Sequence, residues 1–353
     1  MPAHDSTEHA PETDTPHPFA ASRKVAARAV LAPLLAALTV AVTFVTVFLA
    51  ALHNPQPHGL PVAVMGPPRA VAGVERALDA KLPGGFRFTT LSDPAAADRA
   101  VSHRDVYAAL DLNRPGTARI ILAGANGAGV NQTVITAFTG AADKLKASAT
   151  VSDVVPLPRG DSRGLAVFYY VFGLALSSFL FASFFHQSAA GASLGVRITV
   201  PLAFAAVAGA GLAAIADTGF GALAGHPWQV AAVSAMVSYA VCVASAALTR
   251  LFHTIGIAVA GALFIIVGNA TGGGALNWHF LPGGWRWVSQ LLPTGAGVTG
   301  LLNVQYFDSR HLGPVLLTLS LWIGAGLLLL VLLPALRLDA VHRRHAAQRQ
   351  TDI

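Results

Sequence analysis

The sequence predicts a multi-pass α-helical membrane protein with six transmembrane helices and an extracytoplasmic α/β domain between the first and second helices. Hydrophobic residues make up 54% of the 353 residues and charged residues only 11%, whereas soluble domains average about 45–50% and 25%. A single water-soluble core cannot bury this excess of apolar surface. The formal net charge is +6, but no basic run exceeds two residues, so we expect no nucleic-acid partner.

Six uncharged apolar stretches of 17–24 residues predict the six membrane spans, because a bilayer core needs about 17–25 residues of helix. The first is too long for the apolar region of a signal peptide, and no convincing small-residue cleavage site follows it, so we expect a retained anchor. All charged residues between positions 164 and 336 are expected to lie between spans. The predicted spans are Ala29–Leu52, Leu165–Phe185, Ile198–Ala216, Gln229–Thr249, Thr254–Ala270 and Gly313–Leu333.

The distribution of basic residues predicts that both termini are cytoplasmic, with the chain in the plasma (inner) membrane. Lys and Arg concentrate in the cytoplasmic flanks of spans, and long exported domains do not count in this comparison. With this orientation the two tails, 1–28 and 337–353, are a disordered tail and a basic tail on the cytoplasmic side. The short outer loops then hold only Arg286 and Arg310. The inner flanks hold Arg23, Lys24, Arg28, Arg197, Arg250, Arg337, Arg343, Arg344 and Arg349.

Residues 53–164 form the predicted extracytoplasmic domain, because prolines and charges return there. Alternating strand and helix patterns predict the order β-α-β-α-β-β-α-β, which is typical of a small α/β domain. Asp93 and Pro94 mark the start of the second helix as its cap and first residue. The strands are expected at 59–66, 86–91, 106–112, 118–124 and about 152–157, and the helices at 71–82, 93–103 and 131–148.

Several motifs suggest an enzyme, but each lacks groups that its chemistry needs. The segment Gly124–Thr133 has the glycine spacing of an ATP phosphate loop, but Val130 and Asn131 replace the lysine and hydroxyl residue. Ser102, His103 and Asp105 have the residue types of a catalytic triad but are nearly adjacent in the chain, whereas a triad converges in space. His342 and His345 have no third metal ligand nearby. We therefore predict no catalytic residue, cofactor or metal site.

The layout of one anchor helix, a long exported domain and five further helices resembles the permease subunit of a type-2 ABC exporter. Within that group residues 25–335 are similar to the phage-infection-protein-like branch, in which a helix leads into a strand as in Asp93–Leu112. The more specific likeness is in Phe280–Asp308, where two Leu-Pro pairs flank an aromatic cluster and a small-residue helix follows. The matching residues are Pro282, Trp285, Trp287, Pro293, Gly295, Gly297 and Gly300.

Hydropathy independently predicts an unusual structure for the segment 281–302. It is too apolar for open water and too short to span, so we expect two short re-entrant helices in the outer leaflet, buried by protein. Trp285 and Trp287 would anchor them at the interface. Within a five-helix membrane domain, 165–336, this segment would form the outer gate.

The resemblance implies an exporter with nucleotide binding on a separate chain. The expected partners are an ATP-binding cassette ATPase, a second permease in a homodimer or heterodimer, and the lipid bilayer. The loop from His186 to Arg197 would meet the ATPase, with Ser188, Ser193, Leu194 and Arg197 as its coupling residues. The absence of charges inside the predicted spans agrees with energy from a partner, because gradient-driven transporters usually carry ionisable residues there.

The predicted function is therefore a non-enzymatic permease subunit that exports hydrophobic or amphipathic compounds, driven by the separate ATPase. One alternative is a non-transporting membrane scaffold whose exported domain binds a ligand, an envelope component or a phage. Another is an ATP-independent drug efflux protein with the same layout.

Overall fold

The computed structural model describes the backbone of residues 18–351 except 92, 190, 224 and 275, and the side chains of residues 29–332 with the same gaps. The chain divides into two compact units, 1–45 and 46–353. Helix α1 (Pro18–Leu52) contains the candidate span Ala29–Leu52. Because α1 begins at Pro18, residues 18–28 of the tail expected to be disordered are helical, and residues 1–17 lie outside the description.

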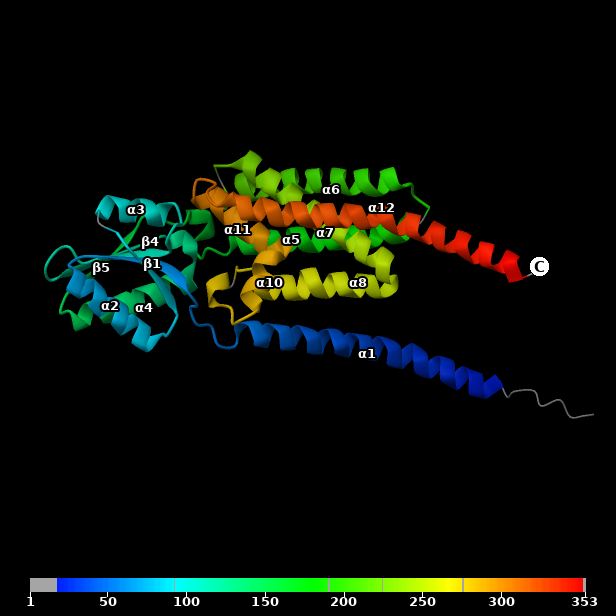
Figure 1. Ribbon diagram of the computed structural model, residues 1–353, viewed down its shortest axis with the longest axis horizontal. Helices are drawn as coiled ribbons and strands as arrows, with labels where there is room; N and C mark the ends of the chain where they lie inside the picture. The colour runs from blue at the N-terminus through cyan, green and yellow to red at the C-terminus, as the bar shows by residue number, and fades with distance from the viewer. Residues whose placement is uncertain (1–17, 92, 190, 224, 275, 352–353) are drawn as a thin grey trace, which may run out of the picture. The chain divides into compact units, whose positions relative to one another are not determined.

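A five-stranded mixed sheet forms the centre of the α/β domain (Figure 1), and its strand order is β2-β1-β3-β4-β5. Only β3 and β4 pair antiparallel, and they are joined by a short turn, while the parallel pairs are connected through helices, as parallel strands require. The predicted order of strands and helices is confirmed. The elements are β1 (Leu60–Met65), α2 (Pro68–Lys81), β2 (Phe86–Thr90), α3 (Pro94–Ser102), β3 (Ala108–Asp111), β4 (Thr117–Leu122), α4 (Ala128–Lys144) and β5 (Ser148–Asp153).

The last helix and strand of this domain begin earlier than predicted. Helix α4 ends at Lys144, and Lys146 turns the chain with φ 52°, so β5 starts at Ser148 rather than near 152. The reason is that β5 is an edge strand, whose exposed residues do not show the apolar pattern of a buried strand.

Side-chain alternation along the strands gives the sheet two apolar faces. Leu60, Val62 and Val64 of β1 pack in a cluster with α2 and α4, which includes the fully buried Phe138. Ala63 and the other alternate residues of β1 pack on the opposite face with α3. This alternation follows from the two-residue period of a strand, and it makes the domain a three-layer structure.

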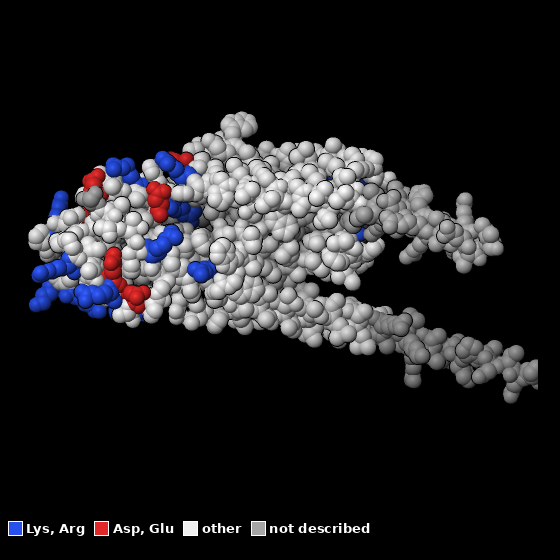
Figure 2. Space-filling model, in the orientation of Figure 1, with Lys and Arg blue, Asp and Glu red and all other residues white. Residues whose placement is uncertain are grey.

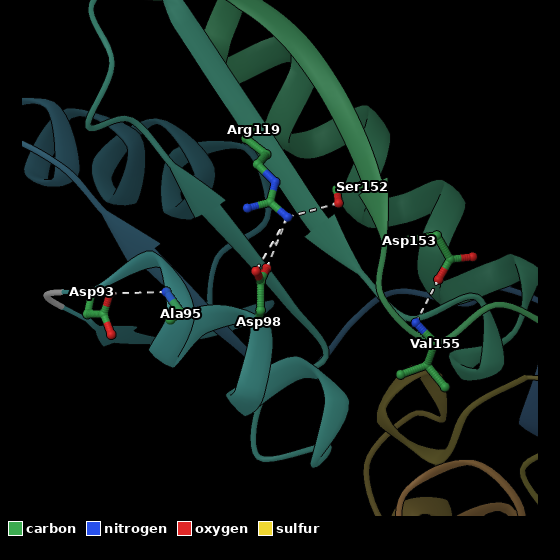
Figure 3. A network of polar contacts seen from close by, with 7 residues as sticks. All are labelled: Asp93, Ala95, Asp98, Arg119, Ser152, Asp153 and Val155. Carbon is green, nitrogen blue, oxygen red and sulfur yellow. Dashed lines mark hydrogen bonds and ion pairs between the residues drawn. The ribbon is translucent and has the colours of Figure 1, made fainter.

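Polar contacts at the surface fix α3 and the edge strand against the sheet (Figure 3). Arg119 of β4 donates from Nη2 to Asp98 Oδ1 of α3 at 3.1 Å and to Ser152 Oγ of β5 at 3.0 Å. Asp93 caps α3 by accepting from the backbone N–H of Ala95, as predicted from its place before Pro94. Asp153, the last residue of β5, accepts from the backbone N–H of Val155 in the segment that follows the strand.

Residues from 165 onwards are mainly helical, and with α1 they supply six helices long and apolar enough to cross a membrane, as expected for a multi-pass membrane protein. Helix α7 lies at the centre and packs against α5, α6, α8, α11 and α12. The elements are α5 (Ala166–Ser188), α6 (Leu194–Ala214), the π-helical turn η3 (Ile215–Gly219), α7 (Pro227–Phe252), α8 (Thr254–Gly261), the π-helical turn η4 (Ala262–Val267), α9 (Gly268–Thr271), the 3₁₀ turn η5 (Trp278–Phe280), α10 (Trp285–Leu291), α11 (Pro293–Tyr306) and α12 (Leu312–Thr351).

Charged residues lie slightly further into these helices than predicted. Arg197 is in the first turn of α6, Arg250 in the last turn of α7, and Asp217 in η3. The prediction that all lie between spans is therefore wrong at helix ends. Arg197 donates to the backbone carbonyls of Ala189 and Ala192, so the free carbonyls after α5 accept from its guanidinium.

Charge separates the two parts of the chain. Figure 2 shows Lys, Arg, Asp and Glu side chains over the α/β domain on this face, and very few over the helices that follow it. The helices instead expose large apolar side chains, such as Val207 at 73% and Leu321 at 63%. Exposed apolar surface on this scale is typical of a region solvated by lipid.

Candidate functional site

Two aromatic side chains from the helical region insert into the cores of the α/β domain, one on each face of the sheet. Phe280 of η5 belongs to the core beside α2 and α4. Phe307, which follows α11, is fully buried in the core beside α3. Because each core is completed by a residue from the membrane side, we call this contact region the junction.

Polar side chains cross the junction between positions about 200 residues apart. Arg104 Nη1 donates to Asn303 Oδ1 of α11 at 2.7 Å. The carboxylate of Asp105 and His311 Nε2, which precedes α12, are 3.1 Å apart. These contacts position the loop after α3 directly over the ends of α11 and α12.

His279 occupies the centre of the junction. It stacks on Trp278 with ring centroids 3.7 Å apart and meets Tyr107 edge to face at 5.2 Å. Burial lowers the pKa of His279 to about 4, and the nearby Arg104 and Arg286 add to the effect. The ring is therefore neutral at pH 7, and its Nδ1 lies 3.3 Å from the carbonyl of His58.

A cavity of about 510 Å³ opens at the junction. Its wall on the domain side carries Arg87, Arg104, Asp105 and Tyr107. The opposite wall is mainly apolar and comes from α10, α11 and α12. The residues of this second wall are Trp287, Gln290, Leu291, Ala296, Thr299, Asn303, Pro314, Val315 and Thr318.

Backbone strain gathers in the two loops that meet here. Arg104 has φ 62°, and Asp308, Ser309 and His311 in the loop between α11 and α12 have φ 50–57°. Residues other than glycine rarely adopt this left-handed conformation, and each such case costs on the order of 1–3 kcal/mol. Surrounding contacts must hold these loops, and strain of this kind is typical of ligand sites.

A second cavity of about 490 Å³ is lined by the glycine-rich segment that resembles a phosphate loop. The segment is a 3₁₀ turn, η1 (Gly124–Asn126), followed by α4, so it is a strand-to-helix turn as expected. Asn131 Nδ2 donates to the carbonyl of Gly124 and thus tightens the turn itself. Val130 is buried in the domain core.

The predicted outer-gate residues come together in and around α10 and α11. Pro293 is the first residue of α11 and is buried, as are the three glycines. A Cβ on Gly297 would lie 2.8 Å from Val237 Cγ2 of α7, and one on Gly300 would lie 2.8 Å from Val315 Cγ1 of α12. A Cβ on Gly295 would overlap the carbonyl of Ser289. The glycines therefore allow close helix contact.

The two tryptophans of this segment differ in their surroundings. Trp285 packs with Ala51 of α1, Ala270 and Leu281, whereas Trp287 is 72% exposed and lines the junction cavity. Pro282, in the loop before α10, accepts from the backbone N–H of Trp285 through its carbonyl. Only Trp287 has the exposure expected of an interfacial anchor.

The predicted coupling residues lie in the loop between α5 and α6. Ser188 ends α5 and donates to the carbonyl of Phe184, and Ser193 caps α6 by accepting from the backbone N–H of Val196. Leu194 begins α6 and is 37% exposed. Arg197 is buried and holds the loop carbonyls, so it supports the loop from within rather than presenting its charge on the surface.

No pattern in the sequence predicted the residues that meet at the junction. Arg104, His279, Asn303 and His311 belong to different elements, and no spacing pattern connects them. The triad candidates also have other partners, since Ser102 donates to the carbonyl of Arg99 and Asp105 contacts His311. Among the described residues, no group of three His, Cys, Asp or Glu side chains could hold a metal ion.

Comparison with known protein families, curated proteins and solved structures gives no match.

Proposed function

We propose that this chain is the permease subunit of an ATP-driven exporter of hydrophobic or amphipathic compounds, with the ATPase on a separate chain. The observation that carries the proposal is the junction cavity, which has a charged wall from the α/β domain and an uncharged, mainly apolar wall from three helices. A compound leaving a bilayer passes between surroundings of these two kinds. Ligand sites of this size and mixed lining are common in binding proteins and transporters.

The proposed topology has the α/β domain outside the plasma membrane and both termini inside. Support comes from the nine-to-two bias of basic residues in the sequence and from the charge on the α/β domain. A cysteine at the exposed Arg114, in a Cys242→Ala background, should react with an impermeant thiol reagent on intact cells. A cysteine at Ser193 should be protected until the cells are opened. The opposite labelling pattern would reverse the topology.

The proposed ATPase contact is the loop that contains Ser188, Ser193 and Leu194. It joins two candidate spans, and its Ser188 and Leu194 are solvent-accessible. Mild-detergent purification of the tagged chain should recover a cassette ATPase and a second permease. The matched pair Leu194→Arg and Leu251→Arg tests the site, because both residues are exposed leucines at helix ends. Loss of the ATPase only with Leu194→Arg supports this loop.

The same experiments separate the alternatives. A scaffold would bind a ligand without any ATP-dependent change in cellular accumulation. An ATP-independent efflux protein would lower accumulation in cells that lack every co-purifying ATPase. Export that requires the recovered ATPase and fails in its hydrolysis-deficient variant is the expected result.

A further inference from the structure

Arg104 forms no ion pair with a carboxylate among the described residues. Its guanidinium is partly buried, with its carbon 5.4 Å from the ring centroid of Tyr107 and 4.9 Å from that of Phe307. Nη1 donates to the neutral amide of Asn303, and Nε is buried without an acceptor. A partly desolvated cation of this kind favours an anionic partner.

A second cation extends the positive wall of the cavity. Arg87 of β2 is exposed, lines the same cavity and makes no ion pair with any described residue. The acidic lining residue, Asp105, lies 3.1 Å from His311 Nε2. With two arginines and one aspartate, the domain side of the cavity has an excess of positive charge.

The cavity continues along α11 from Asn303 past Thr299 to Ala296, with no charged side chain in that stretch of its lining, and opens beside exposed side chains of α10. Asn303 lies next to Arg104, while Ala296 lies two helical turns earlier, about 10 Å along the axis. Val315 of α12 lines the wall beside Gly300, between these two positions. Leu291 is 63% exposed and Trp287 is 72% exposed, so the apolar end is accessible from the surface that faces lipid in the proposed topology.

We infer that the junction cavity binds a single-chain amphiphile with a small anionic head group, either a carboxylate or a phosphate monoester. The head group contacts Arg104 and Arg87, and the chain lies along Leu291, Ala296 and Val315. This inference rests on the proposed function in one respect, namely that the bound amphiphile is the exported compound.

Binding can be measured on the full-length protein in a neutral detergent, using 9,10-dibromostearate as the probe. Its bromine atoms quench tryptophan at short range, and Trp278 and Trp287 line the cavity. The uncharged methyl ester of the same acid reports non-specific partitioning into the micelle. We expect saturable quenching by the acid at neutral pH and weak, unsaturated quenching by the ester. Equal affinity for both would overturn the inference.

The variant Arg104→Gln should weaken binding of the acid by about 10- to 100-fold, which corresponds to loss of charge-assisted hydrogen bonds. Arg104→Lys should recover part of the affinity. Arg114→Gln is the matched control, because this exposed arginine lies in the same domain outside the cavity. Arg87→Gln removes the other cation, which forms no ion pair with any described residue. It therefore tests the site even if Arg104→Gln unfolds the junction. Unchanged affinity in folded Arg104→Gln and in Arg87→Gln contradicts the proposed head-group site.

Competition experiments identify which chemical groups of the ligand the site recognises. Inorganic phosphate or acetate at millimolar concentration should leave the quenching unchanged, whereas displacement by either would make this a site for free anions. A dibromostearoyl phosphate monoester should bind like the acid, and a zwitterionic lysophosphatidylcholine with the same chain should bind weakly. Strong binding of the zwitterionic lipid contradicts an anionic head-group site.

Transport distinguishes this inference from the proposed function. Loss of stearate binding in Arg104→Gln together with loss of ATPase-dependent export supports both. Binding to the wild type without any ATPase-dependent export supports the site and overturns the export function. ATPase-dependent export of another compound, without stearate or phosphate-monoester binding, leaves the function standing and overturns the ligand class.

Discussion

The α/β domain and the helices that follow it are packed in opposite ways. In the domain, large side chains such as Phe138, Leu110 and Ile120 are fully buried between the sheet and its helices. In the helical region, close contacts form where side chains are missing, as at Gly297 and Gly326, and many leucines and valines, such as Val207 and Leu321, are exposed. The difference indicates that burial of apolar surface drives the first region, and close helix approach in lipid the second.

The largest effect on stability is expected when atoms are removed from the core of the α/β domain. Phe138→Ala deletes a fully buried ring that lies 6.4 Å from the ring of Phe86, and it should lower the free energy of unfolding by about 3–5 kcal/mol. Urea titration followed by proteolysis of the α/β domain measures the change. Val151→Ala is the control, because this valine is 53% exposed on the edge strand. A small effect of Phe138→Ala would show that the domain core is not close-packed.

The next effect comes from adding atoms to the helices. Gly297→Leu places a side chain where even a Cβ lies 2.8 Å from Val237, so we expect a loss of about 3 kcal/mol and reduced export. Gly324→Leu is the matched control, because no atom lies within 4 Å of a Cβ at that position. Thermal unfolding in detergent and cellular export provide the two readouts. Equal behaviour of the two variants would contradict glycine-mediated packing.

The third prediction concerns the junction, where the two packing modes meet. Because burial lowers the pKa of His279 to about 4, below the usual 6.5, the unfolded chain takes up a proton first as the pH falls. The stabilisation by the neutral ring is complete above about pH 6.5 and is lost towards pH 4. Between pH 7.5 and 5 this amounts to about 2 kcal/mol.

His279→Phe should remove that part of the pH dependence while retaining a ring against Tyr107. The free energy of unfolding, measured at several pH values for both proteins, gives the difference, because all other titratable groups are shared. Parallel pH profiles for the two proteins would show that the neutral form of His279 is not specifically stabilised.

The smallest effect is expected at the contact between Asp105 and His311 at the edge of the junction. Asp105 and His311 have side chains that are 54% and 51% exposed, so solvent screens their interaction. Asp105→Asn should change the free energy of unfolding by less than about 1 kcal/mol. A double-mutant cycle with His311→Gln measures the coupling. A coupling energy of several kcal/mol would mean that the pair acts as a buried contact.

Local patterns in the sequence were sufficient for most of the fold. Asp93 before Pro94 predicted the start of α3, and uncharged stretches predicted the six candidate spans to within a few residues. The π-helical turns at 215–219 and 262–267 were not predicted, because an apolar helical sequence carries no signal for one extra residue in a turn. The edge strand β5 was predicted about four residues too late, because its exposed residues lack the apolar pattern of a buried strand.

The candidate site was largely beyond sequence reasoning. The glycines at 295, 297 and 300 were identified from composition and from the family resemblance, and they lie at helix contacts. No local pattern marked Arg104 as a site residue, because its contacts are with Asn303 and Phe307, which follow it by about 200 residues. Contacts between distant segments depend on the relative placement of elements, and one sequence does not encode that placement in any local pattern.

The separation of 199 residues between Arg104 and Asn303 also imposes a waiting time during protein synthesis. At about 5–20 residues per second, translation of that interval takes roughly 10–40 s. Once the last strand, β5, has been made, the sheet can assemble from its own strands, but its two apolar faces still lack Phe280 and Phe307, which are synthesised later. The nascent chain therefore carries an incomplete surface that a chaperone could cover, and closure of that surface marks the completion of the membrane region.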